Sequence, residues 1–158
     1  APRLVSAIPL LKERIRDIKN VAIAFPDEGA YKRFGGMFQE YPLILCHKLR
    51  HGSERKVTIL EGDPVGKHAV IVDDLIMSGS TLIACERELF KHGACEVSAY
   101  ATHGVFPKES WMKFSITPTF SHIWITDSCP KIARIVTGLR PFEILTLQPI
   151  ISQIILNP

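Results

Sequence analysis

The fold is decided by residues 69–82, which read Ala-Val-Ile-Val-Asp-Asp-Leu-Ile-Met-Ser-Gly-Ser-Thr-Leu. The first four residues form an unbroken apolar run, which predicts a buried parallel strand that ends at Asp73. Small residues follow, and from Leu82 onward apolar side chains recur at the spacing of a helix. A strand, a tight turn and a helix in succession point the first N–H groups of the helix into the turn, where the helix dipole also favours an anion. The stretch therefore predicts a site for a phosphate group.

The neighbouring carboxylates of Asp73 and Asp74 suit a sugar better than a phosphate. They repel an anion, but they accept hydrogen bonds from ribose hydroxyl groups and are good ligands for a divalent cation. The phosphate would then be bound by the amides and hydroxyls of the turn, namely those of Ser78, Gly79, Ser80 and Thr81. A simpler alternative is that the aspartates and Ser78 only cap a helix and close a turn. Two adjacent carboxylates followed by Ser-Gly-Ser-Thr favour the sugar-phosphate site.

Composition narrows the class of protein. The chain has 158 residues, enough for one domain with a core of its own. Its formal net charge of +3, with 22% charged residues, is too small to indicate a nucleic-acid partner. The four cysteines have no Cys-x-x-Cys spacing, so we expect reduced thiols and a cytoplasmic location. We expect no membrane partner, because no apolar run is as long as a membrane span and no secretion signal opens the chain.

Short apolar runs with strand character alternate with helical patterns along the chain. The runs cover residues 21–25, 43–46, 57–60, 69–72, 97–102, 123–126 and 144–147. Helical spacing of apolar residues occurs in residues 3–18, in the segment that ends at Phe38, and after Leu82. This alternation predicts an α/β fold, with a mostly parallel sheet and helices on both faces, in a single domain over residues 1–158.

Asp27 lies in the segment Phe-Pro-Asp-Glu-Gly-Ala, between a predicted strand and a predicted helix. In a parallel sheet this position is at the same carboxyl edge as Asp73 and Asp74. A lone aspartate before a helix is commonly an N-cap, which is the simplest interpretation. A carboxylate at the ligand edge is also able to hold Mg²⁺ directly or through water. The residues alone leave both roles open.

Lys48-Leu49-Arg50 lies in a basic segment between two predicted strands. Side chains two residues apart point the same way in an extended chain, so Lys48 and Arg50 form a pair of cations. A flexible loop with two cations is able to close over a polyphosphate and neutralise the charge that develops in phosphoryl transfer. The alternative is a solvated loop that keeps a sheet edge soluble. Two further polar residues, His103 and Asp127, also follow strands, and each is either a ligand contact or a structural hydrogen-bonding group.

Several separated motifs resemble one family. Residues 69–82 resemble the phosphoribosyl pyrophosphate loop of the type I phosphoribosyltransferases. The chain as a whole resembles the C-terminal half of the ribose-phosphate pyrophosphokinases, in particular the phosphate-independent group known from plants. The motifs that carry this resemblance are Phe-Pro-Asp-Glu-Gly-Ala-Tyr-Lys-Arg-Phe, Thr-His-Gly-Val-Phe, Val-Phe-Pro-Lys-Glu-Ser-Trp and Ile-Thr-Asp-Ser-Cys-Pro. It implies a type I phosphoribosyltransferase fold and one half of a two-domain enzyme.

The resemblance also implies a reaction. Ribose 5-phosphate would bind at the paired aspartates and at residues 78–81, and its anomeric hydroxyl would attack the β-phosphorus of Mg-ATP, giving phosphoribosyl pyrophosphate and AMP. Lys48 and Arg50 match the Lys-x-Arg of the family's catalytic loop, and Asp27 matches an acidic residue associated with metal. We therefore expect ribose 5-phosphate and ATP as substrates, Mg²⁺ as cofactor and a homo-oligomer.

The sequence departs from the family pattern in places. Met77 stands where many members have an acidic or polar residue, and Ser80 stands where glycine is usual, so we expect its Cβ to restrict φ or to crowd the phosphate. Family members are roughly twice as long, and their N-terminal half supplies the nucleotide-binding loop, whereas nothing here resembles a P-loop. We therefore expect this chain to be catalytically incomplete by itself. Isoleucines near the C-terminus, at positions 150, 151, 154 and 155, either contact the missing half or pack on the domain's own sheet.

Other functions remain open at this point. A phosphoribosyltransferase that consumes phosphoribosyl pyrophosphate would share the phosphate site, although Lys48, Arg50 and the Asp27 segment argue against it. A non-catalytic regulatory subunit associated with the synthetase is a second alternative. An α/β domain without a ligand is the simplest one.

Overall fold

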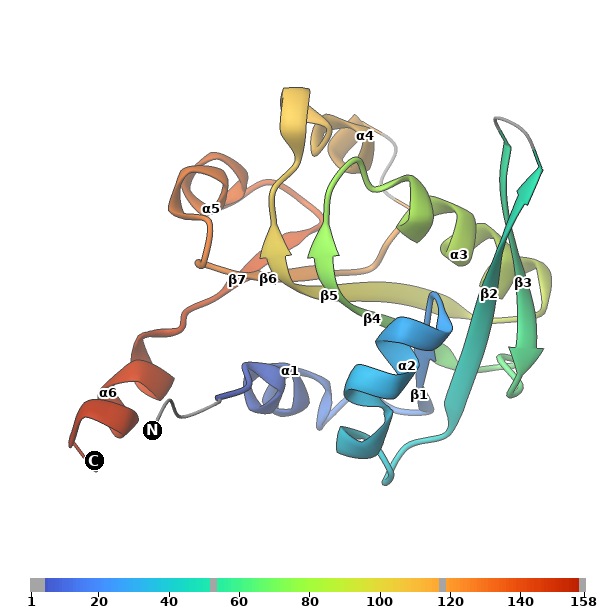
Figure 1. The fold of residues 1–158 in the computed structure, drawn as a ribbon, viewed down its shortest axis with the longest axis horizontal. Helices are drawn as coiled ribbons and strands as arrows, with labels where there is room; N and C mark the ends of the chain where they lie inside the picture. The colour runs from blue at the N-terminus through green and yellow to red at the C-terminus, as the bar shows by residue number, and fades with distance from the viewer. Residues whose placement is uncertain (1–4, 52–53, 117–118, 157–158) are drawn as a thin grey trace.

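The computed structural model describes residues 5–51, 54–116 and 119–156, and these residues form a seven-stranded sheet (Figure 1). The strands are β1 (Val21–Phe25), β2 (Leu43–His51), β3 (Glu54–Glu61), β4 (His68–Ile76), β5 (Glu96–Gly104), β6 (Ile123–Thr126) and β7 (Phe142–Leu145). They lie in the order β3-β2-β1-β4-β5-β6-β7. The pair β2 and β3 is antiparallel, and the other neighbouring pairs are parallel. The predicted mostly parallel sheet is confirmed.

Helices cover both faces of this sheet (Figure 1). They are α1 (Ile8–Ile15), α2 (Glu28–Phe34), α3 (Ser80–Lys91), α4 (Met112–Ile116), α5 (Pro130–Val136) and α6 (Gln148–Leu156), with short 3-10 helices η1 (Gly35–Met37) and η2 (Pro107–Glu109). Helices α1 and α2 pack into the core on one face, and α3, α4 and α5 pack into the core on the other. The predicted α/β class, with helices on both faces, is therefore confirmed.

The buried parts of the central strands are largely apolar because each strand supplies two cores. In β1, Ala22 and Ala24 face the core that contains α3, whereas Val21, Ile23 and Phe25 face the core that contains α1 and α2. Successive side chains of a strand point to opposite faces, so a strand covered on both faces has no position for an exposed polar residue. The first five residues of β4 are buried in the same way. This explains the unbroken apolar runs of the sequence.

The strand order changes direction between β1 and β4. The chain passes from β1 through α2 to β2 on one side, and from β4 through α3 to β5 on the other. In open α/β sheets the crevice at the carboxyl ends of two such strands is where ligands bind. Asp27 follows β1, and the turn before α3 follows β4, so the topology brings both candidate segments to this crevice.

Some element boundaries differ from those predicted. Strand β4 does not end at Asp73 but continues to Ile76, with Leu75 opposite His103 on β5. The backbone ladder continues past the apolar run because its hydrogen bonds do not depend on side-chain polarity. The basic segment is largely the β2–β3 hairpin rather than a loop. Strand β7 begins at Phe142, two residues before the predicted start at 144.

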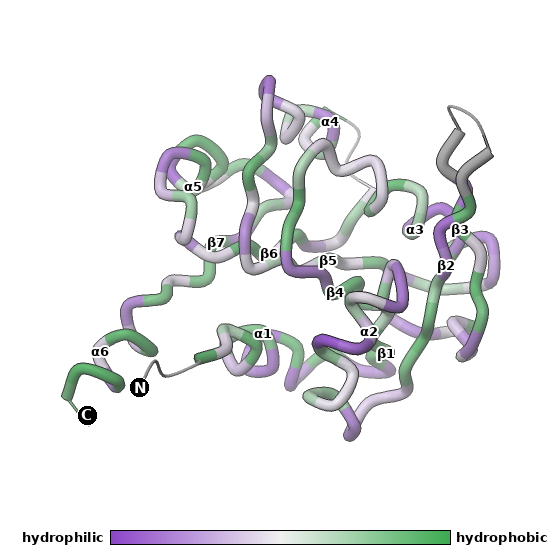
Figure 2. The backbone as a smooth tube through the Cα atoms, in the orientation of Figure 1, coloured by the Kyte–Doolittle hydropathy of each residue, from purple (hydrophilic) through white to green (hydrophobic). Residues whose placement is uncertain are grey.

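Helix α6 has no buried residue and extends away from the sheet (Figure 1). Figure 2 shows that it is nevertheless among the most apolar segments of the described chain. Ile151 and Ile155 are 50% and 70% exposed. These two isoleucines therefore do not pack on the domain's own sheet. None of the described helices, α6 included, is long and apolar enough to cross a membrane.

Candidate functional site

The turn between β4 and α3 encloses a cavity of about 170 Å³. It is lined by Asp73 and by residues 75–82, so the four predicted phosphate-binding residues, Ser78, Gly79, Ser80 and Thr81, share one hollow. The hydroxyl oxygens of Ser78 and Ser80 lie 2.9 Å apart. Helix α3 begins at Ser80, so the amides of its first turn, which have no partner within the helix, lie at the cavity; that of Ser80 is 3.5 Å from Ser78 Oγ. Amides, hydroxyls and the positive end of a helix dipole together favour an anion of the size of a phosphate.

Gly79 is required by the geometry of this turn. Its φ is +77°, in the left-handed region that residues with a Cβ rarely adopt. A Cβ added there would also lie only 2.4 Å from the ring of Phe114. The turn therefore brings its backbone close to α4, and glycine is the residue that permits the approach.

Ser80 does not show the restriction expected from its Cβ. Non-glycine residues with positive φ in the described chain are Asn20, Phe106, Lys108 and Glu109. Ser80 instead starts α3 as an ordinary helical residue, so no strained backbone is needed there. Met77, the other departure from the family pattern, is 48% exposed at the rim of the cavity.

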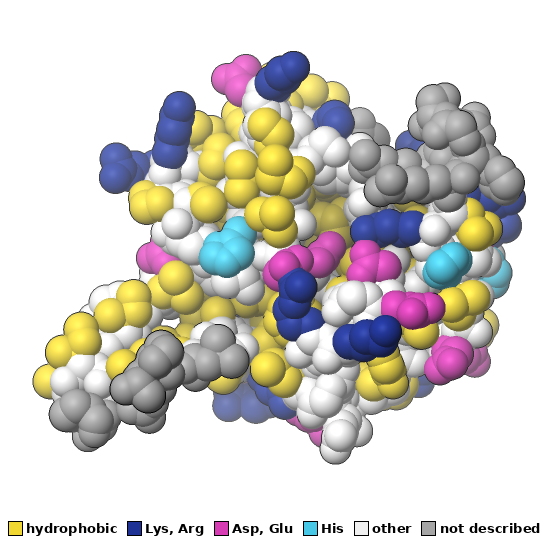
Figure 3. Space-filling model, viewed as in Figure 1, with side chains coloured by type: hydrophobic (Ala, Val, Ile, Leu, Met, Phe, Trp, Pro, Cys, Tyr) yellow, Lys and Arg dark blue, Asp and Glu magenta, His cyan; other side chains and the backbone are white. Residues whose placement is uncertain are grey.

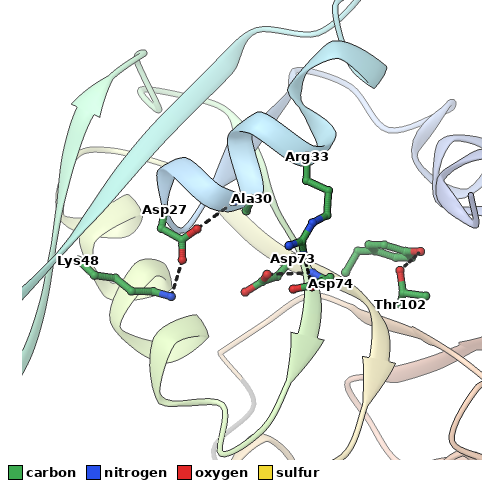
Figure 4. A network of polar contacts seen from close by, with 8 residues as sticks. Asp27, Ala30, Arg33, Lys48, Asp73, Asp74 and Thr102 are labelled. Atoms are coloured by element: carbon green, nitrogen blue, oxygen red, sulfur yellow. Dashed lines mark hydrogen bonds and ion pairs between the residues drawn. The ribbon is translucent and has the colours of Figure 1, made fainter.

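Asp73 and Asp74 have different surroundings. Their side chains alternate across β4, so Asp73 lines the cavity beside α3, whereas Asp74 forms an ion pair with Arg33 of α2 (Figure 4). The amide of Asp74 donates to Asp73 Oδ1 at 2.8 Å. Burial, together with the neighbouring Asp74 carboxyl group, raises the pKa of Asp73 to about 7. Near neutral pH Asp73 is therefore only partly ionised, and Arg33 lies against the carboxyl group of Asp74.

Asp27 combines the N-cap role with an ion pair. Its Oδ1 accepts the amide of Ala30 at 2.9 Å, and its Oδ2 lies 2.6 Å from Lys48 Nζ on β2 (Figure 4). Burial raises the pKa of Asp27, but the hydrogen bonds from Lys48, Ala30 and Gly29 outweigh it, so its pKa lies below the usual value. Asp27 is therefore ionised at neutral pH.

Lys48 lies at the same edge of the sheet as the two aspartates of β4. Figure 3 shows acidic and basic side chains side by side on this face of the molecule. The side chain of Lys48 is 35% exposed, so a polyphosphate in solution is able to reach it. Arg50, the second predicted cation, has its backbone in β2, but its side chain lies outside the part of the chain that the structure describes.

A magnesium ion fits this site only as part of a phosphate complex. Among the described residues there is no group of three His, Cys, Asp or Glu side chains arranged to hold a metal. Mg²⁺, however, usually keeps several waters and binds one or two carboxylates together with substrate phosphates. Asp27 is a suitable single carboxylate, provided that Lys48 gives up its contact with Oδ2.

His103 and Asp127 both have structural partners. His103 Nδ1 lies 2.8 Å from Ser128 Oγ, which in turn donates to the carbonyl of Thr102 at 3.0 Å. Asp127 Oδ1 accepts the amide of Leu147 at 2.9 Å. Of the two roles left open for each, the structural hydrogen bond is the one that these contacts support.

Sequence reasoning missed two parts of the site. Arg33, which pairs with Asp74, is inside the quoted motif that begins at Phe25, but a single arginine on a helix gives no local signal of its partner. The second part is the segment after β5, where Ser110 and Lys113 donate hydrogen bonds to carbonyls of the β4–α3 turn. Its sequence has no phosphate-binding pattern, so only proximity reveals it.

Comparisons with known proteins agree with this architecture. The family described as phosphoribosyl transferase domain matches residues 4–131. "Ribose-phosphate pyrophosphokinase 3, chloroplastic" from Oryza sativa subsp. japonica is 51% identical over 155 residues, and "Ribose-phosphate pyrophosphokinase 3, mitochondrial" from Spinacia oleracea is 48% identical over 155 residues. Each alignment covers 92% of this chain but 38% of the relative, so the chain spans well under half of their length. The crystal structure of phosphoribosylpyrophosphate synthetase from Mycobacterium smegmatis has the same fold, with a TM-score of 0.74 at 23% identity over 93% of this chain and 47% of that one.

Proposed function

The chain belongs to the phosphoribosyl transferase domain family, and from this we propose that it is the ribose 5-phosphate-binding part of a ribose-phosphate pyrophosphokinase. In this reaction pyrophosphate passes from Mg-ATP to the anomeric hydroxyl of ribose 5-phosphate, and the products are phosphoribosyl pyrophosphate and AMP. The observation that carries the proposal is the arrangement at one end of the sheet, where an anion cavity, two carboxylates and a cation lie together. The similarity to plant enzymes of that name supports it.

The proposed binding mode assigns each end of the sugar phosphate to a different part of the site. The phosphate accepts hydrogen bonds from the amides and hydroxyls of residues 78–81. The 2- and 3-hydroxyl groups of ribose donate to Asp73 and Asp74, which are acceptors when ionised. The ion pair with Arg33 holds the Asp74 carboxylate in place before the sugar arrives.

The proposed chemistry uses the cations of the β2–β3 hairpin. Lys48 and Arg50 stabilise the negative charge that spreads over the transferred group in the transition state. Lys48 first has to leave Asp27, which it contacts at 2.6 Å, and the phosphates of the second substrate are the competing anion. The magnesium that accompanies ATP would be held by Asp27, directly or through water, and would neutralise phosphate charge there.

ATP itself is proposed to bind mainly to parts of the protein outside this chain. The sequence has no P-loop, and the plant relatives are more than twice as long as the region that matches. The proposed enzyme is a homo-oligomer. We also propose a cytoplasmic location for this protein. The names of the two relatives, in contrast, specify chloroplasts and mitochondria.

The proposal is tested by titrating the 158-residue chain with ribose 5-phosphate in a calorimeter and by measuring AMP formation with Mg-ATP. We expect binding of ribose 5-phosphate, much weaker binding of ribose, and no AMP, because catalysis needs a second substrate oriented against the first. Robust AMP formation would refute the incomplete-enzyme interpretation. Release of pyrophosphate from phosphoribosyl pyrophosphate that depends on an added base would indicate a phosphoribosyltransferase instead. Failure to bind ribose 5-phosphate, with tight binding to a synthetase, would indicate a regulatory subunit.

A further inference from the structure

One segment after β5, residues 105–114, binds three consecutive carbonyl groups, one at the end of β4 and two in the β4–α3 turn. The amide of Val105 donates to the carbonyl of Ile76 at 3.0 Å. Ser110 Oγ donates to the carbonyl of Met77 at 3.2 Å, and Lys113 Nζ donates to the carbonyl of Ser78 at 3.3 Å. We call residues 105–114 the bracing segment.

The same segment also supports the turn through packing. The ring of Phe114 occupies the space beside Gly79 that a Cβ would otherwise fill. Phe114 in turn packs edge-on against Phe106 and Phe142, with ring centroids 5.9 Å and 6.1 Å away. The bracing segment is thus anchored in the core, and the carbonyls that it binds are held against a rigid support.

Peptide geometry converts these carbonyl contacts into an orientation of amides. In a trans peptide the C=O and the following N–H point in opposite directions. Because the Met77 and Ser78 carbonyls point toward the bracing segment, the amides of Ser78 and Gly79 point away from it. Ser78 and Gly79 both line the cavity, whereas none of the described residues 105–114 is among its lining residues. The amides that point away from the bracing segment therefore belong to residues of the cavity wall.

The positive charge of Lys113 also favours anion binding at the cavity. Among the described residues, those that line the cavity include Asp73, with its carboxyl group, and no lysine or arginine. Lys113 is exposed, and its ammonium group lies at the turn itself, within hydrogen-bonding distance of the Ser78 carbonyl. A positive charge there polarises the Ser78–Gly79 peptide and makes the Gly79 amide a better donor to an anion.

The backbone of the bracing segment carries strain that its surroundings maintain. Phe106, Lys108 and Glu109 have φ values of 44°, 53° and 57°, although none of them is glycine. Such conformations persist only where neighbouring structure holds them, and they occur often at ligand sites. Here the strained residues redirect the chain shortly after β5, so that Ser110 and Lys113 come within hydrogen-bonding distance of the β4–α3 turn.

We infer that Ser110 and Lys113 are positioning residues for the 5-phosphate of the sugar, and that they act by orienting the Ser78 and Gly79 amides. The inference rests on the proposed function, because it takes the cavity to be the phosphate site. It assigns to the segment after β5 a part in ligand binding that the phosphate-loop motif does not contain.

The test uses the 158-residue chain with two probes, ribose 5-phosphate and inorganic phosphate. Affinities are measured by calorimetry, and the backbone amide signal of Gly79 is followed by NMR as inorganic phosphate is added. The variants are Ser110→Ala, Lys113→Met, Lys113→Gln and Lys113→Arg. Lys131→Met is the matched control, because Lys131 is an exposed lysine on α5. Thermal unfolding of every variant shows whether the fold is retained.

We expect Lys113→Met to weaken ribose 5-phosphate binding by about tenfold, the scale of one charge-assisted hydrogen bond. Lys113→Gln keeps a donor but not the charge and should lose about threefold, as should Ser110→Ala, which loses a neutral hydrogen bond. Lys113→Arg should bind like the natural chain, and so should Lys131→Met. In Lys113→Met and Lys113→Gln the phosphate-induced shift of the Gly79 amide should shrink, a change that a general loss of stability would not produce.

The failures of the two hypotheses are distinguishable. If the natural chain binds ribose 5-phosphate and its Gly79 amide responds to phosphate, but Ser110→Ala and Lys113→Met bind equally well, the inference is overturned and the proposed function stands. The inference is likewise overturned if Lys113→Met and Lys131→Met weaken binding equally, because a diffuse charge effect would then suffice. If the natural chain binds neither probe, the proposed function fails and the inference fails with it.

Discussion

Replacement of Asp73 by asparagine should stabilise the folded protein, and the gain should grow as the pH rises. Burial and the neighbouring Asp74 raise the pKa of Asp73 from 3.8 to about 7. Between these two values the folded protein keeps a proton that the unfolded chain releases. The stability associated with this group is therefore fully present below the unfolded pKa and is lost as the pH rises through the folded pKa. Asparagine has no such proton, so the variant escapes the loss.

The size of the effect follows from the two pKa values. A change from 3.8 to about 7, at about 1.4 kcal/mol per pH unit, corresponds to roughly 4 kcal/mol. The interval from about pH 5 to about pH 8 contains roughly 3 kcal/mol of this, and water at the partly exposed carboxyl group screens some of it. We therefore expect the variant to gain about 2 kcal/mol over the natural chain across that interval. Asparagine also retains the oxygen that accepts the Asp74 amide, so the local backbone should not change.

The assay is urea unfolding at a series of pH values, followed by the fluorescence of the buried Trp124. The quantity of interest is the difference in free energy of unfolding between variant and natural chain, because titrating groups remote from Asp73 cancel in it. Asp63→Asn is the matched control, since Asp63 is exposed and its Oδ1 likewise accepts a backbone amide, that of Val65, at 2.9 Å. A difference for Asp73→Asn that stays constant from about pH 5 to about pH 8 would refute the reasoning.

Three further predictions address the proposed site. Asp73→Asn combined with Asp74→Asn should leave the chain folded but weaken ribose 5-phosphate binding in calorimetry with Mg²⁺ present, and an unchanged affinity would remove both carboxylates from the site. In the full-length enzyme, Lys48→Ala and Arg50→Ala should lower kcat and kcat/KM together, because each removes a cation that stabilises charge only in the transition state. A rise in KM alone would show that the hairpin binds the substrate instead of stabilising the transition state. Gly79→Ala should cost about 2 kcal/mol in urea unfolding, because its φ is positive and a Cβ would meet an aromatic ring. Unaltered stability of that variant would show that the turn adjusts freely.

The fold was predictable because its main signal is local. Residues 21–25 and 69–72 are apolar without interruption, and only strands covered on both faces require this. Strand ends were less predictable, since β4 continues through Asp73 to Ile76 by backbone hydrogen bonds to β5. The pattern of side chains does not determine how far a backbone hydrogen-bond ladder extends. Asp73 and Asp74 therefore indicated the end of the strand, although both are part of it.

The sequence indicated which candidate residues gather at the carboxyl edge of the sheet, but not how they are arranged there. The strand, turn and helix around Gly79 lie within a single stretch, and their mutual geometry follows from short-range rules. Asp73 and Asp74, in contrast, looked equivalent in the sequence, yet one lines the cavity and the other pairs with Arg33, 41 positions earlier in the chain. Their difference depends on which helix covers each face of β4.

By itself the sequence determined the α/β class and the strand, turn and helix of residues 69–82, because the spacing of their apolar residues matches the period of a strand or a helix. It also determined the family resemblance, which depends on short motifs of adjacent residues. Only the tertiary structure decided the partners of the charged groups: Lys48 with Asp27, Arg33 with Asp74, and Lys113 with the Ser78 carbonyl. These contacts join separate elements at one edge of the sheet, and they are set by strand order and crossover direction. Charge acts through space over a few ångströms, so residues far apart in the chain share a site once the sheet has brought their strands together.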